Sequence, residues 1–231
     1  MIVIDSQGAP PTRLLSADLL AELHPEMTSI LGGRAETDWA DADLASAHAS
    51  FAADRFLMMP GFLSGADTAL VDLYYRRLNE AGLLTLTSPP HPLRLVIADD
   101  PVGRALLRQF HPIVEAIAGH PLRENYCFTA EYQPGALLPM HRDRAGCEYS
   151  ISLLVNYDPL PPGGRSTWPL DIVSPRHAQP VQFCPARGDA LLFKGRELLH
   201  GRPPLPQTDR CLVLMLHYVD AELPDEQMAP G

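Results

Sequence analysis

The sequence predicts an α+β fold, mainly β, in which helices come first and an antiparallel barrel or sandwich of short strands follows. Apolar residues recur at helical spacing between residues 64 and 118 and change to alternating, strand-like spacing after residue 124. Proline is frequent, with 24 residues that fall mostly between the apolar runs, which favours many short elements joined by turns. Helices followed by many short strands are typical of α+β domains.

The chain has 231 residues, and we expect it to form a single domain. A domain of this size buries roughly three-quarters of the surface of its unfolded chain, so it has room for a large core. Helical pieces are expected near residues 16–24 and 40–54. The expected parts are a helical N-terminal extension, a supporting strand with helices, a strand-rich core and a tail, over residues 1–55, 56–125, 126–220 and 221–231.

Local signals define the elements of the supporting part. Residues 56–59 are apolar and are followed by Pro-Gly, which predicts a short buried strand. Ser64 is a typical helix N-cap, and Gly82 is a plausible end of that helix. Asp100 followed by proline predicts a second helix that ends at Gly119. Strands of the core are then predicted over residues 126–132, 148–157, 181–184, 189–194 and 210–219.

Charge, cysteine usage and hydropathy limit the possible partners. The formal charge of −10 argues against nucleic acid and membrane surfaces, because their phosphates repel an acidic protein. No segment is typical of a signal peptide or approaches the roughly 20 apolar residues needed to span a bilayer. The four cysteines form no C-x-x-C pair, so reduced, buried thiols are expected. We expect a cytoplasmic protein that binds neither nucleic acid nor membranes, and the sequence leaves its oligomeric state open.

Three residues in the strand-rich part have the types that bind iron(II). His141 and Asp143 are two positions apart, so both can reach one ion from one strand end. His200 follows the predicted strand 189–194 and can join them from across a closed β structure. Two imidazoles and one carboxylate occupy one face of the ion and leave the other positions open. An H-x-D triplet arises easily by chance in a chain with 9 histidines, so its weight comes from the surrounding motifs.

Arg210 begins the predicted strand 210–219. The planar guanidinium of arginine can make a two-pronged bond to a carboxylate, which lysine cannot. An exposed arginine at a strand end is the alternative. With His141, Asp143 and His200 upstream, we expect Arg210 to bind the far carboxylate of a dicarboxylate co-substrate.

The order and spacing of these motifs resemble those of the prolyl-hydroxylase-like iron(II)/2-oxoglutarate-dependent dioxygenases over about residues 126–220. Arg210 stands where that family places its basic residue. The resemblance rests on the segments Glu131 to Asp143, Pro162 to Pro169 and Arg187 to Gly201.

The resemblance implies a fold and a ligand set. The fold is a double-stranded β-helix, a jelly-roll or cupin-like barrel, with the N-terminal helices flanking one sheet. By the same resemblance His141, Asp143 and His200 bind iron(II) and form the catalytic centre. The co-substrates are 2-oxoglutarate and dioxygen, and the family leaves room for ascorbate as an accessory reductant.

The resemblance also implies the residues that hold 2-oxoglutarate. They are Arg210 for the distal carboxylate and Tyr132 for a hydroxyl bond. Some relatives share that carboxylate with Ser or Thr two residues after the arginine, and Leu212 stands there in this chain. Ser152 or a tyrosine would then have to supply the missing hydrogen bond.

By this resemblance the chain is a dioxygenase that hydroxylates an unactivated C–H bond of an amino acid, a peptide or a small metabolite and releases succinate and CO2. Asp143 favours hydroxylation over halogenation, because related halogenases carry a small residue there; desaturation and ring formation stay open. Arg142, Arg144, Arg196 and Arg202 flank the ligands and either bind an anionic substrate group or pair with acids. The alternatives are a catalytically silent barrel that acts as a sensor or scaffold, and a cupin-like metalloenzyme without a 2-oxo acid.

Overall fold

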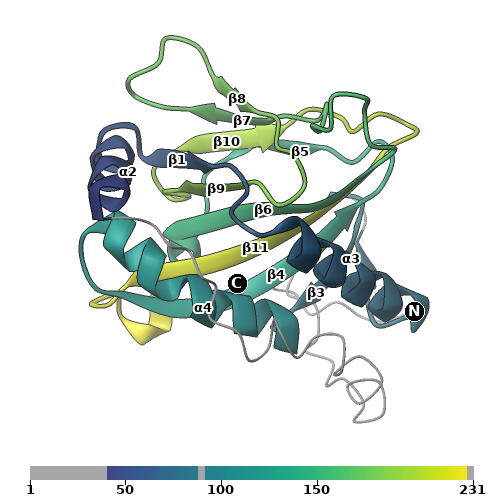
Figure 1. The fold of residues 1–231 in the computed structure, drawn as a ribbon, viewed down its shortest axis with the longest axis horizontal. Helices are drawn as coiled ribbons and strands as arrows, with labels where there is room; N and C mark the ends of the chain where they lie inside the picture. The colour runs from purple at the N-terminus through teal and green to yellow at the C-terminus, as the bar shows by residue number, and fades with distance from the viewer. Residues whose placement is uncertain (1–40, 88–91, 228–231) are drawn as a thin grey trace.

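The structure is a computed structural model that describes residues 41–87 and 92–227, and it consists of two β-sheets with helices on one side (Figure 1). The helices are α2 (Asp41–Asp54), α3 (Gly65–Glu80), α4 (Pro101–Ala118) and the short 3-10 turns η1 (Ala145–Cys147) and η2 (Asp225–Gln227). The strands are β1 (Phe56–Met59), β2 (Thr85–Thr87), β3 (Arg94–Ala98), β4 (Leu122–Tyr132), β5 (Leu138–His141), β6 (Tyr149–Asp158), β7 (Leu170–Val173), β8 (Val181–Phe183), β9 (Ala190–Phe193), β10 (Leu199–Arg202) and β11 (Arg210–Asp220).

The strands form a seven-stranded major sheet in the order β1-β9-β6-β11-β4-β3-β2 and a four-stranded minor sheet in the order β5-β10-β7-β8. The pairings within both sheets are antiparallel. After β4 the chain alternates between the sheets, because β5, β7, β8 and β10 belong to the minor sheet and β6, β9 and β11 to the major one. This alternation defines a double-stranded β-helix, and the predicted α+β, mainly β fold is confirmed.

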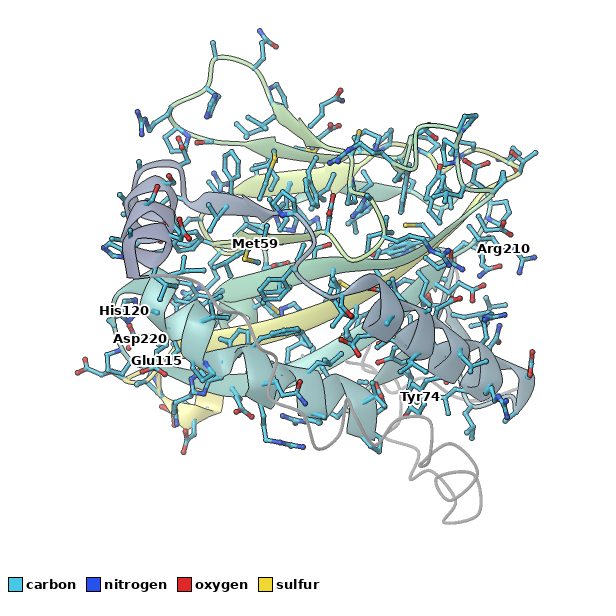
Figure 2. The ribbon with its side chains drawn as sticks, viewed as in Figure 1. Met59, Tyr74, Glu115, His120, Arg210 and Asp220 are labelled. Atoms are coloured by element: carbon cyan, nitrogen blue, oxygen red, sulfur yellow. The ribbon has the colours of Figure 1, made fainter. Side chains whose placement is uncertain are left out.

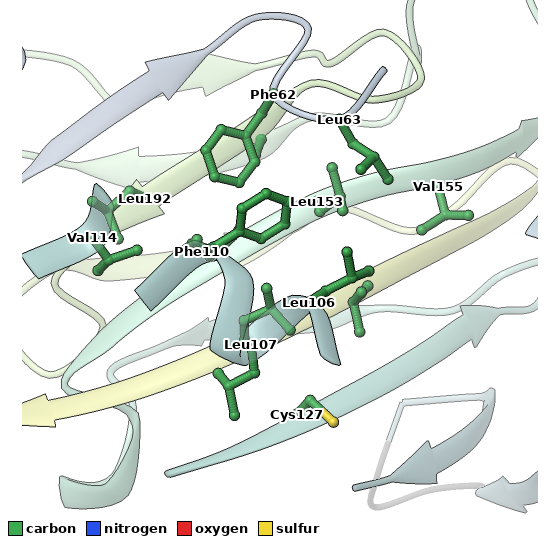
Figure 3. Close-up of a cluster of buried hydrophobic side chains, with 14 of the residues drawn as sticks. Phe62, Leu63, Leu106, Leu107, Phe110, Val114, Cys127, Leu153, Val155 and Leu192 are labelled. Atoms are coloured by element: carbon green, nitrogen blue, oxygen red, sulfur yellow. The ribbon is translucent and has the colours of Figure 1, made fainter. Parts of the chain in front are cut away.

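Helices α3 and α4 cover the outer face of the major sheet (Figure 1). Helix α4 begins where the Asp100 carboxylate accepts hydrogen bonds from the N–H groups of Val102 and Gly103, both 3.1 Å long. It ends at Gly119, whose left-handed φ of 81° is unfavourable for residues that have a side chain. Figure 3 shows Phe110 of α4 against Phe62 and above the strands, within the buried apolar cluster that joins helix and sheet. Burying an apolar side chain of this size stabilises the fold by roughly 1.5–3 kcal/mol.

The predicted strand 56–59, the helices that begin after Ser64 and Asp100 and the strand 210–219 match β1, α3, α4 and β11. The predicted helix 40–54 matches α2, whereas the piece near 16–24 lies outside the described residues. Strands β2, β3, β7 and β10 were not predicted, because such short strands show too little periodicity to be recognised.

Strand β6 corrects one detail of the predicted pattern. The alternation of Tyr149 to Tyr157 predicts that all odd positions share one face, and this holds through Val155, which packs with the helices. The pairing of β6 with β11 then shifts register, because Val213 lies opposite Leu154 and Leu212 opposite Asn156. This bulge moves Tyr157 to the inner face, where it joins a second apolar cluster.

The inner faces of the two sheets enclose that second cluster and a cavity of about 310 Å³ beside it. Trp168 and Tyr132 pack edge to face in the cluster, with ring centroids 5.0 Å apart. None of the described helices is long and apolar enough to cross a membrane.

Candidate metal centre

The structure brings the three predicted ligands together at the inner face of the minor sheet. His141 is the last residue of β5, and His200 lies directly opposite it in β10, with ring centroids 4.4 Å apart. Asp143 Oδ1 lies 3.5 Å from His141 Nε2 and 3.6 Å from His200 Nε2. The three possible ligand atoms are all within 4.8 Å of one another, so one divalent cation could contact all three.

Asp143 reaches this point differently from the sequence prediction. Strand β5 ends at His141, so Asp143 follows the strand instead of belonging to it. Its backbone N–H donates to the carbonyl of Gly195, 2.9 Å away. A methyl group at Gly195 would overlap the Asp143 carboxylate. The close approach of these two segments therefore fixes the carboxylate and depends on the glycine.

The hydrogen bonds of the two imidazoles determine which nitrogen faces the centre. His141 Nδ1 lies 2.8 Å from the carbonyl oxygen of Pro139, and His200 Nδ1 lies 3.0 Å from that of Leu198. A carbonyl oxygen only accepts, so both Nδ1 atoms carry the proton in the neutral rings. Both Nε2 atoms then present a lone pair to the same point. Metal-binding histidines are commonly oriented in this way.

The electrostatics of the three residues favour an ionised carboxylate. Burial would raise the pKa of Asp143, but hydrogen bonds with His141 and His200 outweigh it and hold the pKa well below its usual value. The hydrogen bond with Asp143 raises the pKa of His141 against the effect of its own partial burial. A cation bound at this point would be a direct partner for the ionised carboxylate.

The cavity that contains these residues is rich in arginine. Its lining includes the buried Arg202, the half-buried Arg94 and the exposed Arg142 and Arg144. Among the described residues that line it, Asp143 is the only carboxylate. The inner site is thus electropositive within a protein whose formal charge is −10.

Tyr132 and Ser152, which the sequence analysis assigned to the co-substrate, both line this cavity. Tyr132 Oη accepts a hydrogen bond of 3.2 Å from Arg94 Nη1. Ser152 lies on β6 opposite Met215 of β11, with its side chain on the inner face. The structure therefore places both hydroxyls on the same cavity as the three candidate ligands.

Arg210 does not lie on this cavity, so the structure does not bring it to the three candidate ligands. Its side chain is 57% exposed, and its Nη1 lies 3.7 Å from the Glu131 carboxylate. It lines a separate cavity with residues of α3, and Figure 2 shows Arg210 at the edge of the molecule. Side chains of a strand alternate between faces. Arg210 therefore shares the outer face with Leu212, whereas Cys211 and Val213 point inward.

Arg202 supplies the buried cation that Arg210 does not. Its side chain is 5% exposed, its Nη1 donates to the Trp168 carbonyl at 3.0 Å, and its guanidinium lies 4.7 Å from the centre of the Trp168 ring. Within residues 41–87 and 92–227, no carboxylate lies within ion-pair distance of Arg202 or Arg94. The sequence carried a signal for Arg202, because it is two positions after His200 and so faces the same side of β10.

Two other lining residues were not assigned to the site from the sequence. Arg94 lies in the unpredicted strand β3, so nothing in the sequence placed it near the site. His217 is buried, and its Nδ1 lies 2.9 Å from Ser150 Oγ. Ser150 Oγ in turn donates to Asp143 Oδ2 at 3.3 Å, so His217 supports the candidate ligand through Ser150.

No family model and no curated protein sequence matches this chain. Several solved structures have a similar fold. The epimerase SnoN from nogalamycin biosynthesis, in complex with Fe3+, alpha ketoglutarate and nogalamycin RO, is 16% identical, with a TM-score of 0.65 over 83% of this chain and 94% of that one. A Pseudomonas putida prolyl-4-hydroxylase is 18% identical, with a TM-score of 0.62 over 77% of this chain and 100% of that one. HygX from Streptomyces hygroscopicus, with nickel and 2-oxoglutarate bound, is 15% identical, with a TM-score of 0.59 over 80% of this chain and 94% of that one.

These identities are low, so the similarity establishes the fold. The chain has the double-stranded β-helix fold found in the 2-oxoglutarate–iron(II) oxygenases. On that fold it carries a His-Asp-His cluster at one cavity together with a buried arginine.

Proposed function

We propose that this protein is an iron(II)- and 2-oxoglutarate-dependent oxygenase of the prolyl-hydroxylase-like family. One observation carries the proposal. Two imidazole Nε2 atoms and one carboxylate converge on a cavity that also holds a buried guanidinium without a carboxylate partner in the described residues. The first half of this arrangement suits a divalent cation, and the second half suits the dicarboxylate that would chelate it.

The donor set fits iron(II). His141, Asp143 and His200 supply two neutral nitrogens and one anionic oxygen from one side, which leaves positions for a 2-oxo acid and dioxygen. When bound, the iron supplies the oxidising chemistry, and 2-oxoglutarate is converted to succinate and CO2. The protein's own contribution is to orient the bound groups and to limit the access of water to the partly enclosed site.

Arg202 takes over the role that the sequence resemblance gave to Arg210. A buried charge without a partner costs several kcal/mol, so a bound carboxylate would offset a cost that the protein otherwise bears. The planar fork of Arg202 suits the distal carboxylate of 2-oxoglutarate, and the hydroxyls of Tyr132 and Ser152 face the same cavity. We propose these three residues as the co-substrate site.

The proposed reaction is hydroxylation of an unactivated C–H bond in a small molecule or peptide. Asp143 supports it, because the intact carboxylate leaves no ligand position for a halide. SnoN is named an epimerase, so proteins of this fold also direct the same cofactors to other outcomes. The four cysteines are free, which is consistent with the proposed cytoplasmic location.

The test is anaerobic addition of iron(II) and 2-oxoglutarate, with measurement of the weak visible charge-transfer band of the chelate. We expect the band in the wild type and its loss in His141→Ala and His200→Ala. Arg202→Gln should keep the metal but raise the apparent Kd of 2-oxoglutarate about 10- to 100-fold, because hydrogen bonds to charged groups contribute about 1.5–3 kcal/mol.

Arg210→Gln is the matched control, since Arg210 lies on another cavity. We expect it to leave both Kd values unchanged. Metal binding that survives both His141→Ala and His200→Ala would refute the site. Succinate formation in air separates the enzyme from a silent barrel, because a sensor or scaffold makes none.

A further inference from the structure

The cavity contains more positive charge than the proposed cofactors neutralise. Resting on the proposed function, we propose that the substrate is a small organic oxyanion with an apolar part, and that its carboxylate or phosphate group binds Arg94. Arg94 would then be the residue that determines the charge specificity of the reaction.

The charges of the lining support this assignment. Four arginines face one carboxylate, Asp143, which the metal would use as a ligand. The two negative charges of 2-oxoglutarate match the two positive charges of iron(II), so binding both leaves the net positive charge of the lining unchanged. A positive, partly enclosed cavity in a protein with a formal charge of −10 attracts anions selectively. A neutral or cationic substrate would leave Arg94 without a counter-charge among the described residues.

Arg94 and Arg202 form two separate subsites. The Arg94 guanidinium lies 5.6 Å from the centre of the Tyr132 ring, and that of Arg202 lies 4.7 Å from the centre of the Trp168 ring. Each cation thus packs on a different ring of the aromatic pair. Arg202 is buried on the minor sheet, whereas Arg94 is half-buried on the major sheet. The buried subsite suits the co-substrate, and the more accessible subsite suits the substrate.

Arg94 is held in place but not neutralised. It lies opposite Tyr132 in the β3–β4 pairing, donates to Tyr132 Oη and stacks 4.8 Å from the centre of the Phe128 ring. Its Nε is buried and has no hydrogen-bond partner. Aromatic faces stabilise a guanidinium without removing its charge, so the fork remains able to bind an oxyanion.

The rest of the lining indicates the remainder of the ligand. Between the charged groups the cavity is apolar, with Phe128, Leu138, Leu170, Val213 and Met215. Its volume of about 310 Å³ lies at the small end of the range for ligand sites. A small acid with a hydrocarbon portion matches both features. The exposed Arg142 and Arg144 lie at the same cavity and would favour the entry of such an anion.

The test uses four probes on one scaffold: 3-phenylpropionate, 3-phenylpropyl phosphate, the neutral 3-phenylpropionamide and the cationic 3-phenylpropylamine. Their binding to the anaerobic iron(II)–2-oxoglutarate form is measured by equilibrium dialysis and by the shift of the charge-transfer band. We expect at least one anion to bind about tenfold or more tightly than the amide and the amine. The comparison of the two anions identifies which oxyanion the site prefers.

Arg94→Gln should remove this preference and leave the Kd of 2-oxoglutarate within about twofold of wild type. Arg94→Lys should restore part of it, because lysine keeps the charge and loses the fork. Arg210→Gln should behave as wild type, and thermal unfolding verifies that each variant is folded.

The proposal is wrong if the amide or amine binds as tightly as the anions, if neither anion binds at millimolar concentration, or if Arg94→Gln keeps the preference. It is also wrong if Arg94→Gln weakens 2-oxoglutarate as Arg202→Gln does, since Arg94 then belongs to the co-substrate site. Absence of the charge-transfer band would instead refute the proposed function. Dialysis of the probes against the metal-free protein would still measure the anion preference of Arg94.

Discussion

The two faces of the major sheet are made by the same strands and do different work. On β6, Leu153 points outward into the helix-covered core and is fully buried, whereas its neighbour Ser152 points inward to the cavity. On β11, Leu216 and His217 divide in the same way. The outer face is apolar and closely covered by α3 and α4; the inner face carries hydroxyls and an imidazole around open space. Because successive side chains of a strand point to opposite faces, the residues that stabilise the fold and the residues that line the cavity lie on opposite faces of the same strands.

The separation has a physical basis. An apolar face gains free energy in proportion to the area that it buries, so the outer face can be filled completely. On a polar inner face most buried groups need a hydrogen-bond partner, as Ser150 has in His217 and Asp143. Substitutions on the two faces should consequently affect different measurements.

The largest expected effect is on the outer face. Leu153→Ala should lower the free energy of unfolding by about 2–5 kcal/mol, because it removes buried methyl groups and leaves a cavity. Urea unfolding measures this loss. At temperatures where the variant is folded, its iron(II) and 2-oxoglutarate Kd values should equal those of wild type. A weakened metal site in the folded variant would show that the two faces are coupled.

The next effect concerns the inner apolar cluster at high pH. Tyr157 Oη donates to Asp209 Oδ2 at 2.5 Å, and burial together with this bond raises the pKa of Tyr157 to about 12. Tyrosine in the unfolded chain ionises near pH 10. The folded protein holds the proton more tightly, so this contribution is complete below pH 10 and is lost as the pH rises from about 10 to about 12.

Tyr157→Phe should therefore be less stable than wild type at pH 8, by about 1.5–3 kcal/mol, because the buried Asp209 loses a hydrogen-bond donor. The difference should shrink as the pH rises above 10, where wild type loses the contribution of this proton. Unfolding curves at a series of pH values measure both effects. A difference that stays constant across this range would contradict the role of Tyr157.

The third effect tests the contact that positions Asp143. Gly195→Ala should weaken iron(II) binding about 10- to 100-fold, because the added methyl group displaces the carboxylate and supporting contacts of metal ligands are worth about that much. Gly163→Ala is the matched control, since a side chain there meets nothing within 4 Å. Calorimetric titration with iron(II) under anaerobic conditions compares the two. Equal affinities would mean that Asp143 is held by other contacts.

The sequence predicted an element correctly where apolar residues repeat on one face only. It did not predict the orientation of a strand where both faces are apolar. The apolar stripe of α4 and the Asp100 cap are local signals, so the helix and its limits were predictable. In β11, Leu212, Val213 and Leu214 are consecutive apolar residues, so the alternation does not indicate which face is inward. The role of Arg210 was assigned from its position in the motif alone. In the structure the alternation of side chains along β11 places Arg210 on the outer face.

The candidate ligands were predictable for a different reason. The order and spacing of the motifs around His141, Asp143 and His200 singled these residues out before any geometry was known, and the structure brings them together. Arg94 had no comparable signal, because it lies in a five-residue strand and reaches the site only through long-range pairing with β4. Local periodicity predicts elements, whereas convergence of side chains depends on contacts between distant segments.

The smallest expected effect is that of Ser152→Ala, which changes the inner face of β6 next to Leu153 on the outer face. Ser152→Ala should change the free energy of unfolding by no more than about 1 kcal/mol, because the side chain borders open space. If its hydroxyl bonds the co-substrate, the Kd of 2-oxoglutarate should rise about 2- to 10-fold, as expected for a neutral hydrogen bond of about 0.5–1.5 kcal/mol. Titration of the charge-transfer band measures this change, and urea unfolding of the same sample provides the stability. A stable variant with an unchanged Kd would remove Ser152 from the co-substrate site and leave Tyr132 and Arg202 to hold the carboxylate. A large loss of stability would contradict the conclusion that the outer face determines stability and the inner face the binding site.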